Sequence, residues 1–106
     1  MMEKPNLEYI NQLARGDESI KKELIDVIKS EFPEEKQDYY NSLENKDYKK
    51  IEENVHRLKH KISILGLEKS YKKANDYEHN LRELNLEGFK EFEIILVTIS
   101  EYLETM

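Results

Sequence analysis

The amino-acid sequence predicts an all-α protein, and three observations lead to that prediction. The chain has 106 residues, enough for one domain spanning 1–106 and too few for two. It contains only three glycines and two prolines, which leaves few residues for the turns of a β fold. Apolar residues recur three and four positions apart over most of the chain. We therefore expect an antiparallel four-helix bundle with a short N-terminal capping helix.

The capping helix is expected from Asn6 to about Ala14, after Pro5, and Gly16 is expected to end it. Its inward positions are predicted to be Leu7, Ile10 and either Leu13 or Ala14.

The second helix is expected to begin after Asp17 or Ser19, either of which can cap its first turn. Pro33 interrupts the apolar pattern, but the pattern resumes beyond it, so we expect a kink and not a break. The apolar positions of this helix are Ile20, Leu24, Val27, Ile28, Phe32, Tyr39, Tyr40 and Leu43.

The third helix is predicted over residues 47–65, after a turn formed by Asn45, Lys46 and Asp47. Five apolar residues share one narrow face of this helix: Ile51, Val55, Leu58, Ile62 and Leu65. His56, His60 and Ser63 project on the opposite side, with Lys59 at the boundary.

Two more helices complete the predicted bundle, separated by a turn at residues 85–88. The fourth is expected to pack with Leu67, Tyr71, Ala74, Tyr77 or Glu78, Leu81 and Leu84. The last is expected to pack with Phe89, Phe92, Ile95, Leu96, Ile99, Tyr102 and Leu103.

Composition excludes several classes of function. The net charge of −6 argues against general nucleic-acid binding. No cysteine is present, which removes disulfides, thiol catalysis and cysteine-based zinc sites. The longest apolar run, residues 94–99, is too short to cross a membrane, and the N-terminus lacks the apolar core of a signal peptide. We expect a soluble cytoplasmic protein that does not contact a membrane.

Charge is distributed unevenly along the chain. Residues 49–73 contain eight basic and three acidic side chains, a net charge of +5. Since the whole chain has a net charge of −6, the remaining residues together carry −11. His56 lies inside this basic segment, which is either ordinary surface charge or a docking site for an acidic partner or a phosphate.

His56 is the candidate nucleophile. Imidazole is partly neutral near pH 7, is nucleophilic at Nε2, and forms a labile phosphoramidate that can be passed on. Lys59 follows three residues later, where its ammonium group can balance the charge of a phosphoryl group.

The run His56-Arg57-Leu58-Lys59, followed by Gly66 ten residues after the histidine, resembles the histidine-containing phosphotransfer (HPt) family. That family's motif reads His-x-Leu-Lys-Gly, then small residues, then the later glycine. Pro33 and the turn before the third helix extend the resemblance over most of the chain, from about Leu7 to the C-terminus.

The resemblance implies a phosphorelay intermediate and not a conventional enzyme. His56 would receive a phosphoryl group from the aspartate of one receiver domain and donate it to another, with a hybrid histidine kinase as the expected source. The receiver would supply Mg²⁺, so we expect no cofactor in this chain, which we expect to be a monomer. Many members place a Gln or Glu where Glu78 lies, with its side chain bonded to Nδ1 of the histidine. The expected partner-binding residues are Arg57, Lys61, Ser63 and Lys69.

One departure from the motif leaves alternatives open. His60 occupies the usual glycine position, where it narrows access to His56 or hydrogen-bonds a phosphoryl oxygen. The chain could instead be an HPt-like docking module that transfers no phosphate. A metal-binding bundle is a third hypothesis, since His56 and His60 have i,i+4 spacing and His79 with Glu78 could complete a shell.

Overall fold

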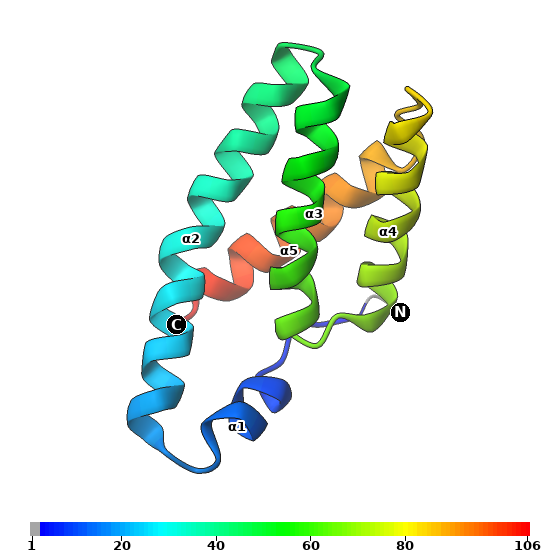
Figure 1. Ribbon diagram of the computed structural model, residues 1–106. Coiled ribbons are helices and arrows are strands. Elements are labelled where there is room, and N and C mark those ends of the chain that lie inside the picture. The colour runs from blue at the N-terminus through cyan, green and yellow to red at the C-terminus, as the bar shows by residue number, and fades with distance from the viewer. Residues whose placement is uncertain (1–2) are drawn as a thin grey trace.

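The computed structural model describes residues 3–106, and these residues form five α-helices and no strand (Figure 1). The helices are α1 (Glu8–Ala14), α2 (Glu18–Glu44), α3 (Tyr48–Ile64), α4 (Glu68–Arg82) and α5 (Phe89–Glu104). All five predicted helices are present, and each boundary lies within a few residues of the expected one. None of the helices in this part of the chain is long and apolar enough to cross a membrane.

Local sequence signals account for several helix ends. The Asp17 Oδ1 atom accepts a hydrogen bond from the backbone N–H of Ser19 at 2.9 Å, and Asp47 Oδ1 accepts one from Lys50 N–H at 3.2 Å. These side chains satisfy donors that have no partner inside α2 and α3. Pro33 lies within α2, which continues on both sides of it.

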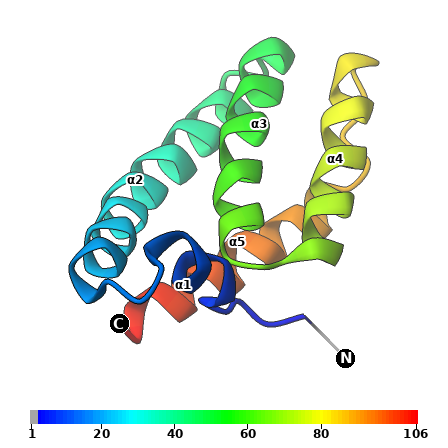
Figure 2. The ribbon, with the colours of Figure 1, turned by 60° about the horizontal axis from the view of Figure 1, so that its bottom comes forward.

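The helices are arranged around α3. It packs against α2 on one side and α4 on the other, while α5 runs obliquely behind them and contacts α4 and α2. The short α1 packs against the beginning of α2, at one end of the molecule (Figure 2). Because α3 lies between two neighbours, its side chains can reach partners on both α2 and α4.

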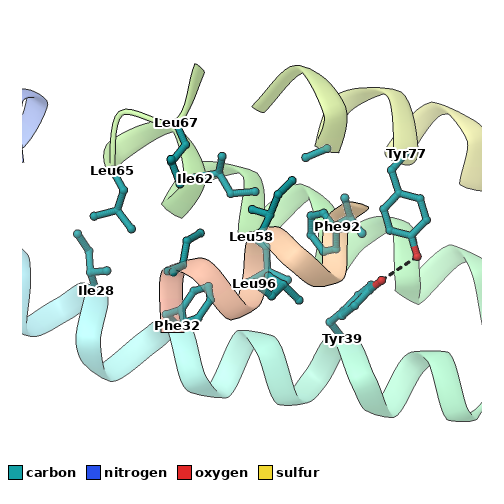
Figure 3. Packing of buried hydrophobic residues seen from close by; sticks show 14 of the residues in the cluster. Ile28, Phe32, Tyr39, Leu58, Ile62, Leu65, Leu67, Tyr77, Phe92 and Leu96 are labelled. Carbon is teal, nitrogen blue, oxygen red and sulfur yellow. Dashed lines mark hydrogen bonds between the residues drawn. The ribbon is translucent and has the colours of Figure 1, made fainter. Parts of the chain in front are cut away.

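The core lies between these helices and contains apolar side chains from all five (Figure 3). All five apolar positions predicted for α3 are buried. Tyr39 and Tyr77 are also buried, their hydroxyl oxygens 2.8 Å apart in a hydrogen bond that joins α2 to α4. Phe92 of α5 packs against both rings, at centroid distances of 5.1 and 5.3 Å.

Some side chains predicted to face the core are exposed instead. Leu84 is 69% exposed because α4 ends at Arg82, which leaves Leu84 in the following loop and off the helix face. Helical spacing predicts that a side chain is buried only where the helix continues and a neighbouring element covers that face. The other exposed side chains for which the sequence predicted or allowed an inward position are Leu13, Ile20, Val27, Tyr71 and Phe89.

The N-terminal segment, residues 3–6, forms hydrogen bonds with the turn between α3 and α4 and with the start of α4. Gly66 has φ +76°, a conformation that favours glycine, and a Cβ atom there would lie 2.6 Å from the side chain of Asn6. The backbone N–H of Asn6 donates to the Leu65 carbonyl at 2.9 Å. The carboxylate of Glu3 accepts from the N–H groups of Lys69 and Ser70 at 2.9 and 3.0 Å, in the first turn of α4.

Candidate functional site: a histidine held by a buried carboxylate

His56 lies in the middle of α3 with its side chain 59% exposed. Its neighbours Val55 and Leu58 are fully buried, so the apolar face of the helix fixes the direction in which His56 points. The ring therefore stands on the surface, where a second molecule can reach it.

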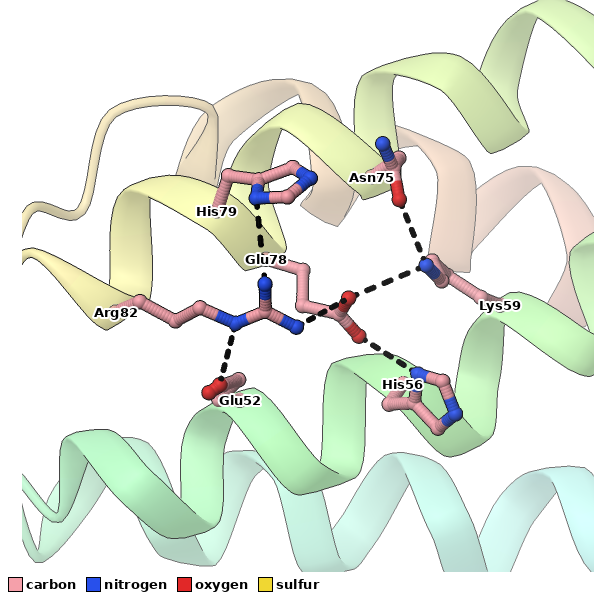
Figure 4. A network of polar contacts seen from close by, with 7 residues as sticks. All are labelled: Glu52, His56, Lys59, Asn75, Glu78, His79 and Arg82. Atoms are coloured by element: carbon pink, nitrogen blue, oxygen red, sulfur yellow. Dashed lines mark hydrogen bonds and ion pairs between the residues drawn. The ribbon is translucent and has the colours of Figure 1, made fainter.

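Glu78 of α4 contacts the inner side of this ring. Its side chain is only 4% exposed, and its Oε1 atom lies 2.9 Å from His56 Nδ1. Since an ionised carboxylate only accepts hydrogen bonds, this contact places the imidazole proton on Nδ1. The other ring nitrogen, Nε2, then carries the free lone pair, and Figure 4 shows it on the side of the ring turned away from Glu78.

Lys59, expected at the boundary between the apolar and polar faces of the helix, is buried. It is 5% exposed, and its Nζ donates to Glu78 Oε2 at 3.2 Å and to Asn75 Oδ1 at 2.9 Å. The same Nζ lies 5.1 Å from the centre of the Tyr71 ring. The close packing of α3 on α4 explains this placement, because Lys59 lies on the side of α3 that faces α4.

Arg82 completes the polar network (Figure 4). Its guanidinium lies 3.5 Å from Glu78 Oε2 and donates from Nε to Glu52 Oε2 at 3.1 Å. The network thus holds two carboxylates and two cations, and the buried carboxylate that contacts His56 has its charge compensated. Pattern reasoning did not single out Asn75, Glu52 or Arg82, although Arg82 lies at the i+4 position from Glu78 where such pairs form.

His60 lies beside His56 on the surface of α3. It is exposed, and the two ring centroids are 5.2 Å apart with the ring planes perpendicular. Ser63 is also exposed, on the turn of α3 that follows His60. Both residues are therefore on the same accessible surface as the free nitrogen of His56.

The basic residues on the other side of α3 pair with acids of α2. Lys61, expected to bind a partner, has a side chain only 11% exposed, with Nζ 2.9 Å from Glu31 Oε1. The same Nζ donates to Glu35 Oε2 at 3.3 Å. Arg57 is half-exposed, and its Nη1 lies 3.2 Å from Asp38 Oδ2. The basic segment defined along the sequence is thus partly neutralised in space by the acidic helix beside it.

Lys69 is exposed, but it lies in the first turn of α4. It precedes Glu78 by nine residues, about 13 Å along a helix axis, so it does not join the group around His56. Lys72 and Lys73 are likewise exposed and continue this cationic surface.

The histidines do not form a three-ligand metal centre. Glu78 is directed at His56 Nδ1, and His79 Nδ1 lies 3.4 Å from Arg82 Nη1. Within residues 3–106, no group of three or more His, Cys, Asp or Glu side chains is placed to hold a metal ion. The metal shell suggested by the sequence spacing is therefore not assembled.

The chain matches no protein-family model, and no significant similarity to a curated protein or to a solved structure is found.

Proposed function

We propose that this chain is a phosphorelay intermediate in which His56 accepts a phosphoryl group from a receiver-domain aspartate and passes it to another receiver. The observation that carries the proposal is the exposed His56 ring with its Nδ1 bonded to a buried carboxylate. This arrangement leaves Nε2 both nucleophilic and accessible, which are the two requirements for transfer between proteins.

The transfer needs little chemistry from this chain. The lone pair on Nε2 forms the N–P bond while the P–O bond to the aspartate breaks and the aspartate leaves as a carboxylate. The proton on Nδ1 stays in place, and Glu78 balances the positive charge that develops on the ring. Donation to the next receiver is the reverse of this step.

The resemblance to the HPt family also supports the proposal. We further propose that α2–α5 form an antiparallel four-helix bundle, with α1 as its cap and a kink at Pro33, as the spacing of apolar residues predicts. The partners we propose are receiver domains with their own Mg²⁺, supplied with phosphate through a hybrid histidine kinase. We propose a cytoplasmic, monomeric protein that binds neither nucleic acid nor a membrane.

The direct test is incubation with a phosphorylated receiver domain. We expect the chain to take up label that is labile in acid and stable in alkali, as a phosphohistidine is. His56→Gln should abolish the uptake, because the amide side chain cannot form the N–P bond. His79→Gln is the matched control, since it changes an exposed histidine on α4 and should keep the label.

Labelling of His56→Gln at the parent rate would contradict the proposal and would point to His60 as the acceptor. A complete lack of labelling, together with measurable binding to the receiver, would favour the second candidate, a docking module that transfers no phosphate. The specific observation behind that candidate is the His60 ring, 5.2 Å from His56, which restricts the approach of a partner.

A further inference from the structure

A phosphoryl group on His56 Nε2 would carry two negative charges into an exposed site, so some group of this chain or of its partner must compensate for them. Lys59 is the expected group, but its Nζ is buried and already bonded to Glu78 and Asn75. Moving it to Nε2 would break both bonds and leave the buried Glu78 with fewer partners. Lys59 is therefore poorly placed to contact the phosphoryl group.

His60 is a neighbour of the exposed His56 ring that can donate a hydrogen bond. His60 follows one helical turn later, and its ring lies edge to face with that of His56 at 5.2 Å. Arg57 is directed to the other side of α3, where it pairs with Asp38. The His60 ring is exposed, and none of the hydrogen bonds among residues 3–106 involves it, so its orientation can follow a group bound at His56.

We propose that His60 is the residue of this chain that contacts the phosphoryl group on His56, by donating an N–H to one of its oxygens. In this proposal, Lys59 acts only by holding Glu78 in place. The inference rests on the proposed function and adds to it a residue that selects partners. A side chain that covers the phosphoryl group protects it from water and narrows the set of receivers that can approach it.

A small phosphoryl donor allows a test without any receiver. Phosphoramidate can phosphorylate the full-length chain directly: Nε2 forms the N–P bond, the P–N bond of the donor breaks, and ammonia leaves. The readouts are the ³¹P resonance of phospho-His56 and its half-life in buffer. Circular dichroism checks that each variant is folded.

We expect His60→Ala to shorten the half-life of phospho-His56 about fivefold, the effect of losing one hydrogen bond, and to shift its ³¹P resonance. His60→Gln should restore most of the half-life, because its amide can also donate. His79→Gln is the matched control, since it alters an exposed histidine on α4 that does not contact His56. It should behave like the parent chain.

An unchanged half-life and an unchanged resonance in His60→Ala would overturn the proposal. Failure of phosphoramidate to label His56 would overturn it as well. If the His60 effects appear but no receiver ever exchanges phosphate with the chain, this inference stands and the phosphorelay function fails.

Discussion

At the scale of single residues, the central feature is that one carboxylate serves three donors. Glu78 is bonded to His56 and Lys59 and lies near Arg82, and both Glu78 and Lys59 are almost fully buried. A buried ion pair of this kind adds little net stability compared with an apolar pair, but removing one partner leaves an uncompensated charge.

This reasoning predicts the stability of variants of the pair. Glu78→Gln should lower the free energy of unfolding by about 3 kcal/mol, because it leaves the Lys59 ammonium buried without an anion. The double variant Lys59→Met/Glu78→Leu should be destabilised less than Glu78→Gln. Urea unfolding of the three proteins measures both values. A double variant less stable than Glu78→Gln would show that the packing of these side chains, and not their charge, dominates.

The buried tyrosines predict a loss of stability in alkali. Burial, with the hydrogen bond to Tyr77, raises the pKa of Tyr39 well above its usual value. Burial also raises the pKa of Tyr77, and burial with the bond to Glu93 raises the pKa of Tyr40 to about 12. In the unfolded chain these phenols ionise near pH 10, so above that pH the loss of protons stabilises only the unfolded state.

We therefore expect the free energy of unfolding to fall above pH 10, by about 1.4 kcal/mol per pH unit for each phenol that stays neutral in the folded state. Unfolding curves measured between pH 8 and 11 give this slope. The slope should be shallower in Tyr39→Phe, although that variant is less stable at neutral pH because the Tyr77 hydroxyl loses its partner. Identical slopes in the two proteins would rule out Tyr39 as a source of the effect.

At the scale of helices, α4 begins without a cap from its own sequence. Its N-cap residue, Leu67, has no side-chain hydrogen-bonding group, and Glu3 satisfies two of the first N–H groups instead. Burial alone would raise the pKa of Glu3, but the hydrogen bonds from Lys69 and Ser70 outweigh it, and the pKa lies below 4.5. The folded state therefore favours the ionised carboxylate, as expected for a negative charge at a helix N-terminus.

Glu3→Ala should lower the free energy of unfolding by about 1 kcal/mol at neutral pH, the usual effect of losing a helix cap. Because the folded pKa is lowered, the part of this contribution that depends on ionisation is present above pH 4.5 and is lost as the pH falls through the folded pKa. The difference between parent and variant should thus shrink in acid. Thermal unfolding at neutral and acidic pH measures it, and a difference that grows in acid would contradict this account.

Sequence patterns offered Asp17 or Ser19 as the cap of α2, and the Asp17 side chain forms it, because a cap acts within three residues of its own position. They could not predict Glu3 as a cap, since 66 residues separate it from Lys69. The same distinction applies to the site. The exposure of His56 follows from the periodicity of α3, whereas the burial of Lys59 depends on how closely α4 packs.

At the scale of the whole molecule, charge has to be counted in space and not along the chain. The acidic side chains of α2 compensate Lys61 and Arg57, so the cations that stay exposed near the basic segment include Lys69 and Lys72. No pattern within residues 49–73 contains this information, because the compensating acids lie on a different helix.

Charge reversal distinguishes the exposed lysines from the lysine that pairs with acids of α2. Lys69→Glu/Lys72→Glu should lower stability by no more than about 1 kcal/mol, through the lost attraction between Lys69 and Glu3, because both lysine side chains are exposed. If the proposed receiver presents an acidic surface, the reversal should slow association with it, and more strongly at low salt than at high salt. Lys61→Glu should instead destabilise the fold, since it places a third carboxylate beside Glu31 and Glu35.

Stopped-flow association rates at several salt concentrations, with urea unfolding of the same proteins, test this prediction. An association rate that does not respond to reversal at Lys69 and Lys72 would mean that this surface takes no part in the encounter.

The N-terminal residues that cross the turn between α3 and α4 have a consequence for how the protein should be handled. His56 lies on α3 and Glu78 on α4, the two helices that this turn joins. The hydrogen bonds of Glu3 and Asn6 to the turn therefore also limit the separation of the imidazole and the carboxylate. A purification tag or fusion placed directly before these residues would disturb the hydrogen bonds that Glu3 and Asn6 form with this turn. Samples tagged at opposite ends are therefore expected to differ in histidine reactivity, even with an unaltered helix content.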